Sequence, residues 1–229
     1  MLECFDLESY VITLKNERPV FFSEADFQMA LARLIAESNT SIKVMLEYPY
    51  YVEPGNKEKS QIQYFDILLT DEDSFVVIEL KYRQKKLKEE YFDSYTGLPI
   101  YLKNHSAHDQ GCFQFWNDVY RIENAREMKT IAGKSFAKGY SLMMTNDSCY
   151  WKESNKETSY NAFRLFEGRT IDNGYKMAFR EGTAKSSNGD KKFVSRSDYS
   201  VSWKDYSNLF EKDSGQFRYL LMEIKPDGT

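Results

Sequence analysis

Residues 62–83 constrain the fold of this chain more than any other stretch. Two apolar arms, 62–70 and 75–82, flank the short polar link 71–74. Apolar runs joined by an acidic, turn-forming link are typical of a β-hairpin. The sequence therefore predicts two neighbouring antiparallel strands with largely buried side chains.

Three charged residues interrupt the apolar arms of this hairpin. Asp66 lies within the first arm, and Glu79 and Lys81 follow the apolar run of the second. Because side chains alternate along a strand, Glu79 and Lys81 should point to the same face. An unpaired charge in such a place is costly. We therefore expect these groups to pair with one another, to bind a cation, or both; a structural ion pair at a strand end is the alternative interpretation.

The surrounding segments predict an α/β protein with a defined order of elements. Ser23 precedes an apolar pattern of helical spacing, which predicts a helix over 24–37. The remaining core elements follow from the same periodicity: a strand over 43–52, the two hairpin arms, a helix over 107–129 and a strand over 140–145. No linker divides the chain. We expect one domain over 1–229, with a core over 24–145 and a β-rich C-terminal elaboration over 146–229 packed on it.

Composition sets broad limits on compartment and partners. The net charge of −4 is nearly neutral, so any contact with nucleic acid must come from a local basic patch. Three cysteines without a Cys-x-x-Cys pattern argue against a disulfide framework and predict a reducing compartment. The N-terminal residues lack the features of a signal peptide, and no apolar segment has the length of a membrane span. We therefore expect a cytoplasmic protein without a membrane partner.

The order of the charged residues resembles that of the PD-(D/E)xK phosphodiesterase superfamily. Asp66 is followed after twelve residues by Glu79-Leu80-Lys81, and Phe65 stands where that motif often has proline. The resemblance covers about residues 24–145 and implies a restriction-endonuclease-like αβββαβ core, with a central mixed sheet flanked by helices. An uncharacterised bacterial group within the superfamily is similar over further stretches, namely 23–28, 79–82, 139–147 with Trp151, 162–165 and 217–221.

The resemblance implies a role for each residue of the motif. The carboxylates of Asp66 and Glu79, with the carbonyl oxygen of Leu80, would bind Mg²⁺ or Mn²⁺, since these hard cations prefer oxygen ligands. Lys81 would lie beside the attacking water and the scissile phosphate. Glu24, at the start of the first helix, is the candidate for the acidic residue that often completes such a site.

Substrate contacts are expected from polar residues near these catalytic candidates. Gln28 lies one helical turn after the first acidic candidate and on the same face. Arg83 belongs to a basic run that continues to residue 88, which indicates either a phosphate-binding patch or a solvated face. Gln110 and Gln114 begin a polar stripe that continues through residues 117 and 121; it is either the solvated side of the helix or a wall of the site.

Two classes of function follow from these observations. The first is a metal-dependent nuclease that acts on nucleic acid, a class whose members often form homodimers. The second is a catalytically silent module of the same fold that binds nucleic acid or a protein partner. His105 and His108 have the spacing of a zinc-binding pair, although without nearby cysteines a surface or capping role is the simpler interpretation.

Overall fold

The structure is a computed structural model that describes residues 2–52, 61–181, 191–211 and 213–226. The helices are α1 (Leu7–Glu17), α2 (Glu24–Ser38) and α3 (His108–Met128), with 3-10 turns η1 (Leu2–Cys4), η2 (Asn161–Phe163) and η3 (Asp213–Gly215). The strands are β1 (Lys43–Val52), β2 (Gln61–Thr70), β3 (Ser74–Arg83), β4 (Thr130–Ile131), β5 (Lys134–Thr145), β6 (Thr170–Ile171), β7 (Lys176–Ala178), β8 (Lys192–Val194), β9 (Tyr199–Ser200), β10 (Trp203–Asn208) and β11 (Gln216–Ile224).

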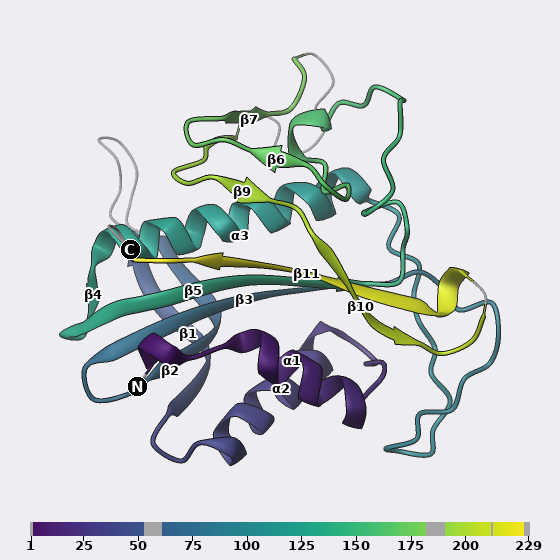
Figure 1. The fold of residues 1–229 in the computed structure, drawn as a ribbon, viewed down its shortest axis with the longest axis horizontal. Coiled ribbons are helices and arrows are strands. Elements are labelled where there is room, and N and C mark those ends of the chain that lie inside the picture. The colour runs from purple at the N-terminus through teal and green to yellow at the C-terminus, as the bar shows by residue number, and fades with distance from the viewer. Residues whose placement is uncertain (1, 53–60, 182–190, 212, 227–229) are drawn as a thin grey trace.

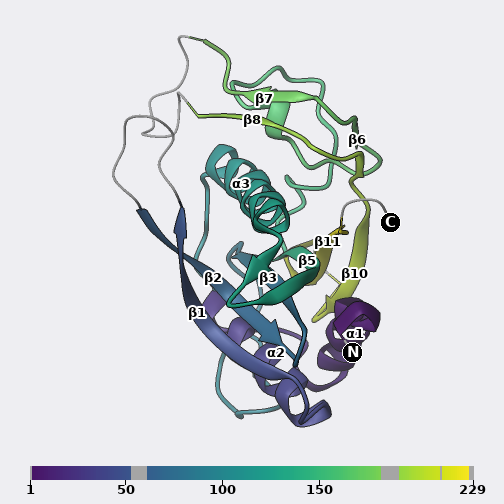
Figure 2. The same cartoon turned by 90° about the vertical axis from the view of Figure 1, so that its left-hand side faces the viewer.

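A mixed sheet forms the centre of the molecule, with helices on both faces (Figures 1 and 2). Its strand order in the described residues is β1-β2-β3-β5-β11-β10, and β4 pairs with β5 beside this path. Strands β3 and β5 are parallel, whereas the other neighbours are antiparallel. The predicted α/β class, with a mixed central sheet flanked by helices and additional β elements, is confirmed.

Helices α1 and α2 cover one face of the sheet (Figure 2). Helix α2 begins as predicted, because the Ser23 side chain accepts a hydrogen bond from the backbone N–H of Asp26 at 3.2 Å. Its buried stripe, which includes Phe27 and Leu31, belongs to the same apolar cluster as Ile78 and Leu80 of β3. This packing fixes the start of α2 near the end of β3.

Helix α3 covers the opposite face, between the central sheet and two small sheets, β6-β9 and β7-β8 (Figure 1). Its residues Trp116, Val119 and Ile122 share an apolar cluster with Val77 of β3. The Trp116 indole donates a hydrogen bond to the carbonyl oxygen of Phe163 at 3.0 Å, which ties the C-terminal region to the helix. Helix α3 therefore packs against the central sheet on one side and against the C-terminal region on the other.

The C-terminal third contributes two strands to the central sheet. Strand β11 pairs with β5 and β10 pairs with β11, so these two strands extend the central sheet itself. Residues 161–163 form the 3-10 turn η2, and residues 164–166 after it are irregular. Among the described residues, no helix combines the length and the apolar character that crossing a membrane requires.

Candidate active site

Strands β2 and β3 separate in the middle of the hairpin. Their ladder joins only Ile67–Thr70 to Phe75–Ile78, although β3 continues to Arg83. On its other side β3 stays paired with β5 along its whole length. The edge of β3 that faces β2 therefore has backbone donors beyond Ile78 that need other partners.

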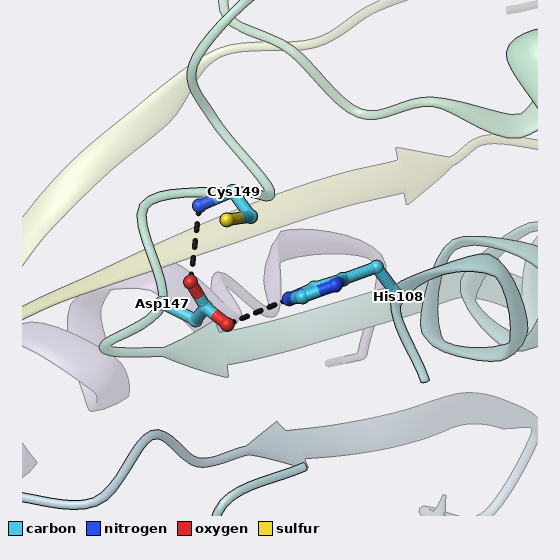
Figure 3. Close-up of side chains that lie close together, drawn as sticks. All are labelled: His108, Asp147 and Cys149. Carbon is cyan, nitrogen blue, oxygen red and sulfur yellow. Dashed lines mark hydrogen bonds and ion pairs between the residues drawn. The ribbon is translucent and has the colours of Figure 1, made fainter. Parts of the chain in front are cut away.

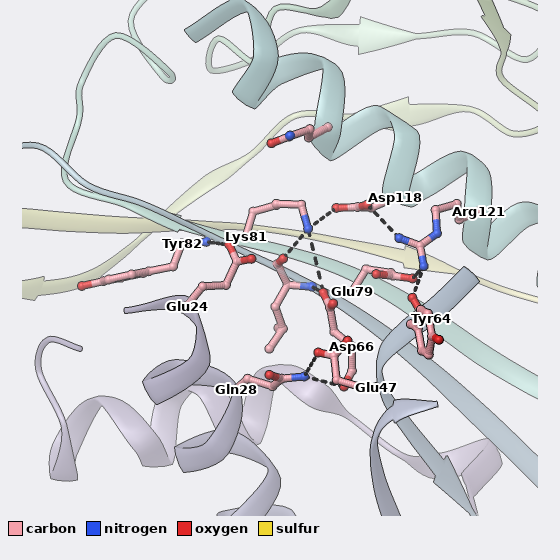
Figure 4. A network of polar contacts seen from close by, with 12 residues as sticks. Glu24, Gln28, Glu47, Tyr64, Asp66, Glu79, Lys81, Tyr82, Asp118 and Arg121 are labelled. Atoms are coloured by element: carbon pink, nitrogen blue, oxygen red, sulfur yellow. Dashed lines mark hydrogen bonds and ion pairs between the residues drawn. The ribbon is translucent and has the colours of Figure 1, made fainter. Parts of the chain in front are cut away.

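Two carboxylates take the place of the missing strand. The Oδ2 atom of Asp66 accepts a hydrogen bond from the Leu80 N–H at 2.6 Å, and the Oε2 atom of Glu24 accepts one from the Tyr82 N–H at 2.7 Å (Figure 4). Glu24 is the first residue of α2, and the residue as a whole is exposed. Its carboxylate is partly desolvated, and this desolvation raises the pKa of Glu24. Two of the three predicted acidic residues, Asp66 and Glu24, are thus fixed at one edge of β3.

The strands are also distorted opposite the point of separation. Glu47 of β1 has a φ of 49°, a left-handed conformation that is uncommon for a residue other than glycine. Leu68 and Phe65 of β2 both belong to the core cluster on the α3 side, although simple alternation would place them on opposite faces. The Gln28 amide bridges this region, donating to the Asp66 carbonyl oxygen at 2.6 Å and to Glu47 Oε1 at 2.9 Å.

Lys81 lies at the centre of the polar network (Figure 4). Its Nζ is 3.0 Å from Asp118 Oδ2 and 3.9 Å from Asp66 Oδ2, and it donates to the Leu80 carbonyl oxygen at 2.7 Å. Burial alone would lower the pKa of Lys81, but the negative charges of Asp118, Asp66 and Glu24 raise it above its usual range. The amine is therefore a permanently charged group in the neutral pH range.

Glu79 lies deeper than the other motif residues and is completely buried. The Arg121 guanidinium is its ion partner, with Nη2 at 3.1 Å from Oε1, but neither carboxylate oxygen has a hydrogen bond from the described residues. Burial, followed by the charges of Asp118 and Asp66, raises the pKa of Glu79 well above its usual range. Burial also raises the pKa of Asp118, to about 6.

Helix α3 contributes Asp118 and Arg121, two residues outside the predicted catalytic set. Arg121 Nη1 lies 3.7 Å from Asp118 Oδ1, and the guanidinium also donates to the Tyr64 carbonyl oxygen. The sequence contains a signal for Asp118, which lies three residues after Phe115 and four before Ile122 on the apolar stripe of the helix. A charge on that stripe indicates a buried partner.

A cleft of about 660 Å³ opens beside Lys81, between the start of α2, the end of β3, the following segment and α3. Two of the predicted substrate-binding residues, Arg83 and Gln114, line it, and the Arg83 guanidinium donates to the Gln114 side-chain oxygen. Gln28 does not line the cleft; its side-chain amide donates a hydrogen bond to the Asp66 carbonyl oxygen. Gln110 is not among the described residues that line the cleft; its amide donates to Asp109 Oδ2 at 3.3 Å.

The network has more acidic than basic groups, but a divalent cation at it stays a prediction, because among the described residues only His108, Asp147 and Cys149 bring three possible ligand atoms within 4.8 Å of one another. Four carboxyl groups, those of Glu24, Asp66, Glu79 and Asp118, share the cations Lys81 and Arg121, and the pKa values of Glu24, Glu79 and Asp118 are raised. The excess negative charge and the unbonded Glu79 oxygens are what an oxygen-liganded Mg²⁺ or Mn²⁺ would neutralise. The Leu80 carbonyl, the third predicted ligand, contacts the Lys81 amine instead.

A second polar cluster lies at the start of α3 and consists of His108, Asp147 and Cys149 (Figure 3). One ligand atom from each lies within 4.8 Å of the others, and His108 Nε2 is 2.7 Å from Asp147 Oδ2. This mixture of nitrogen, oxygen and sulfur suits Zn²⁺ better than Mg²⁺ or Mn²⁺. His105 does not join it, because His105 lines the cleft and its Nδ1 accepts a hydrogen bond from the Gln84 N–H at 3.3 Å.

Comparisons of this chain with known protein families, curated proteins and solved structures found no match. No protein-family model matches the chain. No curated protein and no solved structure matches it significantly. Membership of the PD-(D/E)xK superfamily therefore stays a prediction.

Proposed function

We propose that this chain is a Mg²⁺- or Mn²⁺-dependent phosphodiesterase of the PD-(D/E)xK superfamily that hydrolyses nucleic acid. The observation that carries the proposal is the position of Asp66. Its Oδ2 accepts a hydrogen bond from the Leu80 N–H and lies 3.9 Å from Lys81 Nζ. An acidic residue on one strand thus meets the Glu-x-Lys segment of the next where the two strands part. The element order α2-β1-β2-β3-α3-β5, interrupted only by the short β4, supports a restriction-endonuclease-like core.

The proposed roles follow from chemistry and position. Asp66 and Glu79, with the Leu80 carbonyl, would hold the cation, which when bound lowers the pKa of water and offsets charge on phosphate. Lys81 places a fixed positive charge where the scissile phosphate would develop negative charge. Asp118 orients the Lys81 amine from α3, at 3.0 Å.

A catalytically silent module is the second candidate, and one contact favours it. The Arg121 guanidinium already neutralises Glu79, as a structural ion pair would. In that case the cleft would bind nucleic acid or a protein partner without cleavage. A homodimer is a further prediction of the nuclease hypothesis, and a cytoplasmic location stays a prediction from the composition.

Nuclease assays with matched variants test the proposal. Purified protein with Mn²⁺ or Mg²⁺ should hydrolyse labelled DNA or RNA, and EDTA should stop the reaction. We expect Lys81→Ala to abolish cleavage but to keep Mn²⁺ binding, because the amine is not a ligand. Asp66→Ala should lose both, since a hard cation without this carboxylate binds weakly.

The control for these variants is Lys204→Ala, which removes a half-exposed lysine that pairs with Glu8 outside the site. It should cleave like the parent protein. Absence of any metal-stimulated cleavage of DNA and RNA, together with unchanged Mn²⁺ binding in Asp66→Ala, would rule out the nuclease and leave the silent module.

A further inference from the structure

We infer that the cleft beside Lys81 takes a single nucleic-acid strand, and that Tyr101 is the platform on which one of its bases stacks. This inference rests on the proposed function, because it names the substrate class of the same site. The observations that support it come from the segment after β3, whose residues 101, 103 and 105 form one wall of the cleft.

Alternate residues of the wall line the cleft. Tyr101, Lys103 and His105 all line the cleft, whereas Leu102 is buried beneath them. Alternation of this kind is what an extended backbone produces. Three groups of different chemistry, an aromatic ring, an ammonium and an imidazole, therefore lie in a row along one side of the cleft.

Gln84 fixes this wall to the end of β3. Its side-chain oxygen accepts the Lys103 N–H at 3.2 Å and its backbone oxygen accepts the His105 N–H at 2.8 Å. The Gln84 amide also donates to the Phe22 carbonyl oxygen at 3.0 Å, next to the start of α2. The wall is therefore bonded to both elements that position Lys81 and Glu24.

Each group on the wall suits one part of a nucleotide. Tyr101 is 76% exposed and lines the cleft, so one face of its ring can be reached by a ligand. Exposed aromatic rings beside a basic groove are the means by which proteins hold unpaired bases. Lys103 and Arg83 supply positive charge for the backbone phosphates.

His105 adds a neutral hydrogen-bond donor to the wall. Its Nδ1 accepts the Gln84 N–H, so in the neutral ring the proton is on Nε2. Burial, followed by the charges of Arg83 and Lys103, lowers the pKa of His105, so the ring is neutral at pH 7. A neutral donor can serve a base edge or a phosphate oxygen.

The exposed Tyr101 ring favours a single strand over a duplex. A volume of about 660 Å³ is within the range of sites that enclose a small molecule or an unstacked nucleotide. The bases of a duplex are stacked on one another and paired, so they offer no free face to Tyr101. Recognition through an exposed ring therefore selects strands whose bases are unpaired.

Fluorescence anisotropy can test this inference without cleavage. The probes are a fluorescein-labelled single-stranded DNA, an RNA of the same sequence and the corresponding DNA duplex, in EDTA at low salt. We expect at least one single strand to bind at least tenfold more tightly than the duplex, and the DNA and RNA probes identify the sugar. Tyr101→Leu should raise Kd about 5- to 150-fold, the loss of one stacking contact, while Tyr101→Phe should bind like the parent protein.

The matched control is Tyr51→Leu, which removes a tyrosine that is 68% exposed and lies outside the described lining of the cleft. Its Kd should not change. Equal or tighter binding of the duplex, no binding of any probe, or an unchanged Kd in Tyr101→Leu would overturn the inference. Binding that depends on Tyr101 without cleavage in Mn²⁺ would instead overturn the proposed hydrolysis and leave the inference standing.

Discussion

The Lys81 amine lies 3.0 Å from Asp118 Oδ2, so the lysine of the motif is tied to helix α3 as well as to the hairpin. Asp118 is almost completely buried, and Lys81 is only 15% exposed. The contact couples the position of the proposed catalytic lysine to the packing of α3 on the sheet. It also makes the stability of the metal-free protein sensitive to pH.

Replacement of Lys81 by methionine should expose this coupling. At pH 8 the Lys81→Met protein contains a buried carboxylate without its ammonium partner, and we expect a loss of about 3–5 kcal/mol in the free energy of unfolding. A carboxyl whose pKa is raised in the folded state favours folding at low pH and opposes it as pH rises through that pKa. Since the pKa of Asp118 is raised to about 6, the loss should be smaller at pH 5.

Urea unfolding of the parent and variant proteins at pH 5 and pH 8 measures this difference. Lys204→Met is the control, because an exposed ion pair contributes about 1 kcal/mol or less. An equal loss at both pH values in Lys81→Met would show that Asp118 is not the group that the lysine neutralises.

Arg121 should compete with a bound cation for Glu79. Arg121→Gln removes the guanidinium 3.1 Å from Glu79 Oε1, leaving a buried carboxylate that a divalent ion can neutralise. We expect the variant to be less stable than the parent without metal but to bind Mn²⁺ about tenfold more tightly, a difference of about 1.4 kcal/mol. Titration calorimetry measures the affinity; Arg196→Gln, which removes a surface ion pair with Glu127, should bind like the parent.

Metal affinity should fall in acid. A cation binds the ionised carboxylates, and the pKa values of Glu79 and Asp118 are raised, the latter to about 6. As pH falls through 6, the cation must displace protons, so we expect Kd for Mn²⁺ to rise about tenfold per pH unit for each proton displaced. Calorimetry at pH 5.5 and 7.5 in buffers of different ionisation enthalpy counts these protons. An affinity that does not change between these pH values would place the cation at groups with ordinary pKa values.

The contact between α3 and β5 leaves no room for a side chain at Gly139. A Cβ at this position would lie 2.0 Å from Ile122 Cγ2. Gly139→Ala should therefore push α3 from the sheet, destabilise the protein by about 1–3 kcal/mol and disturb the placement of Asp118 over Lys81. Thermal unfolding measures the loss, and Ser135→Ala, at an exposed position of β5, should have little effect. An unchanged unfolding temperature in Gly139→Ala would show that α3 packs less tightly than the structure has it.

Local patterns predicted most of the central elements. Helix α2 follows from the cap at Ser23 and its apolar spacing, and the hairpin of β2 and β3 follows from two apolar arms around a polar link. Both signals lie within a short stretch of chain. The placement of β10 and β11 in the central sheet could not be predicted in this way, because β11 pairs with β5 across a long separation in sequence and no local pattern specifies that partner.

The sequence likewise predicted the site residues that lie on the hairpin and the first helix, but not the contacts that α3 makes with them. Asp66, Glu79 and Lys81 stand out as charges within apolar arms, whereas Glu24 was named because the resemblance implies an acidic residue from the first helix. The ion pair between Glu79 and Arg121 depends on how α3 is positioned along β3, which no local pattern encodes. Asp118, by contrast, was missed although its position on an apolar helix stripe marks it as a buried charge with a partner.

The location of Mn²⁺ in crystals of the protein tests the central claim most directly. Anomalous diffraction from crystals soaked in Mn²⁺ should give a peak bound by Asp66 and Glu79, at the point where β2 and β3 separate, and the peak should be absent in Asp66→Ala. A peak only at His108, Asp147 and Cys149, or none at saturating Mn²⁺, would contradict a metal-dependent site at the hairpin.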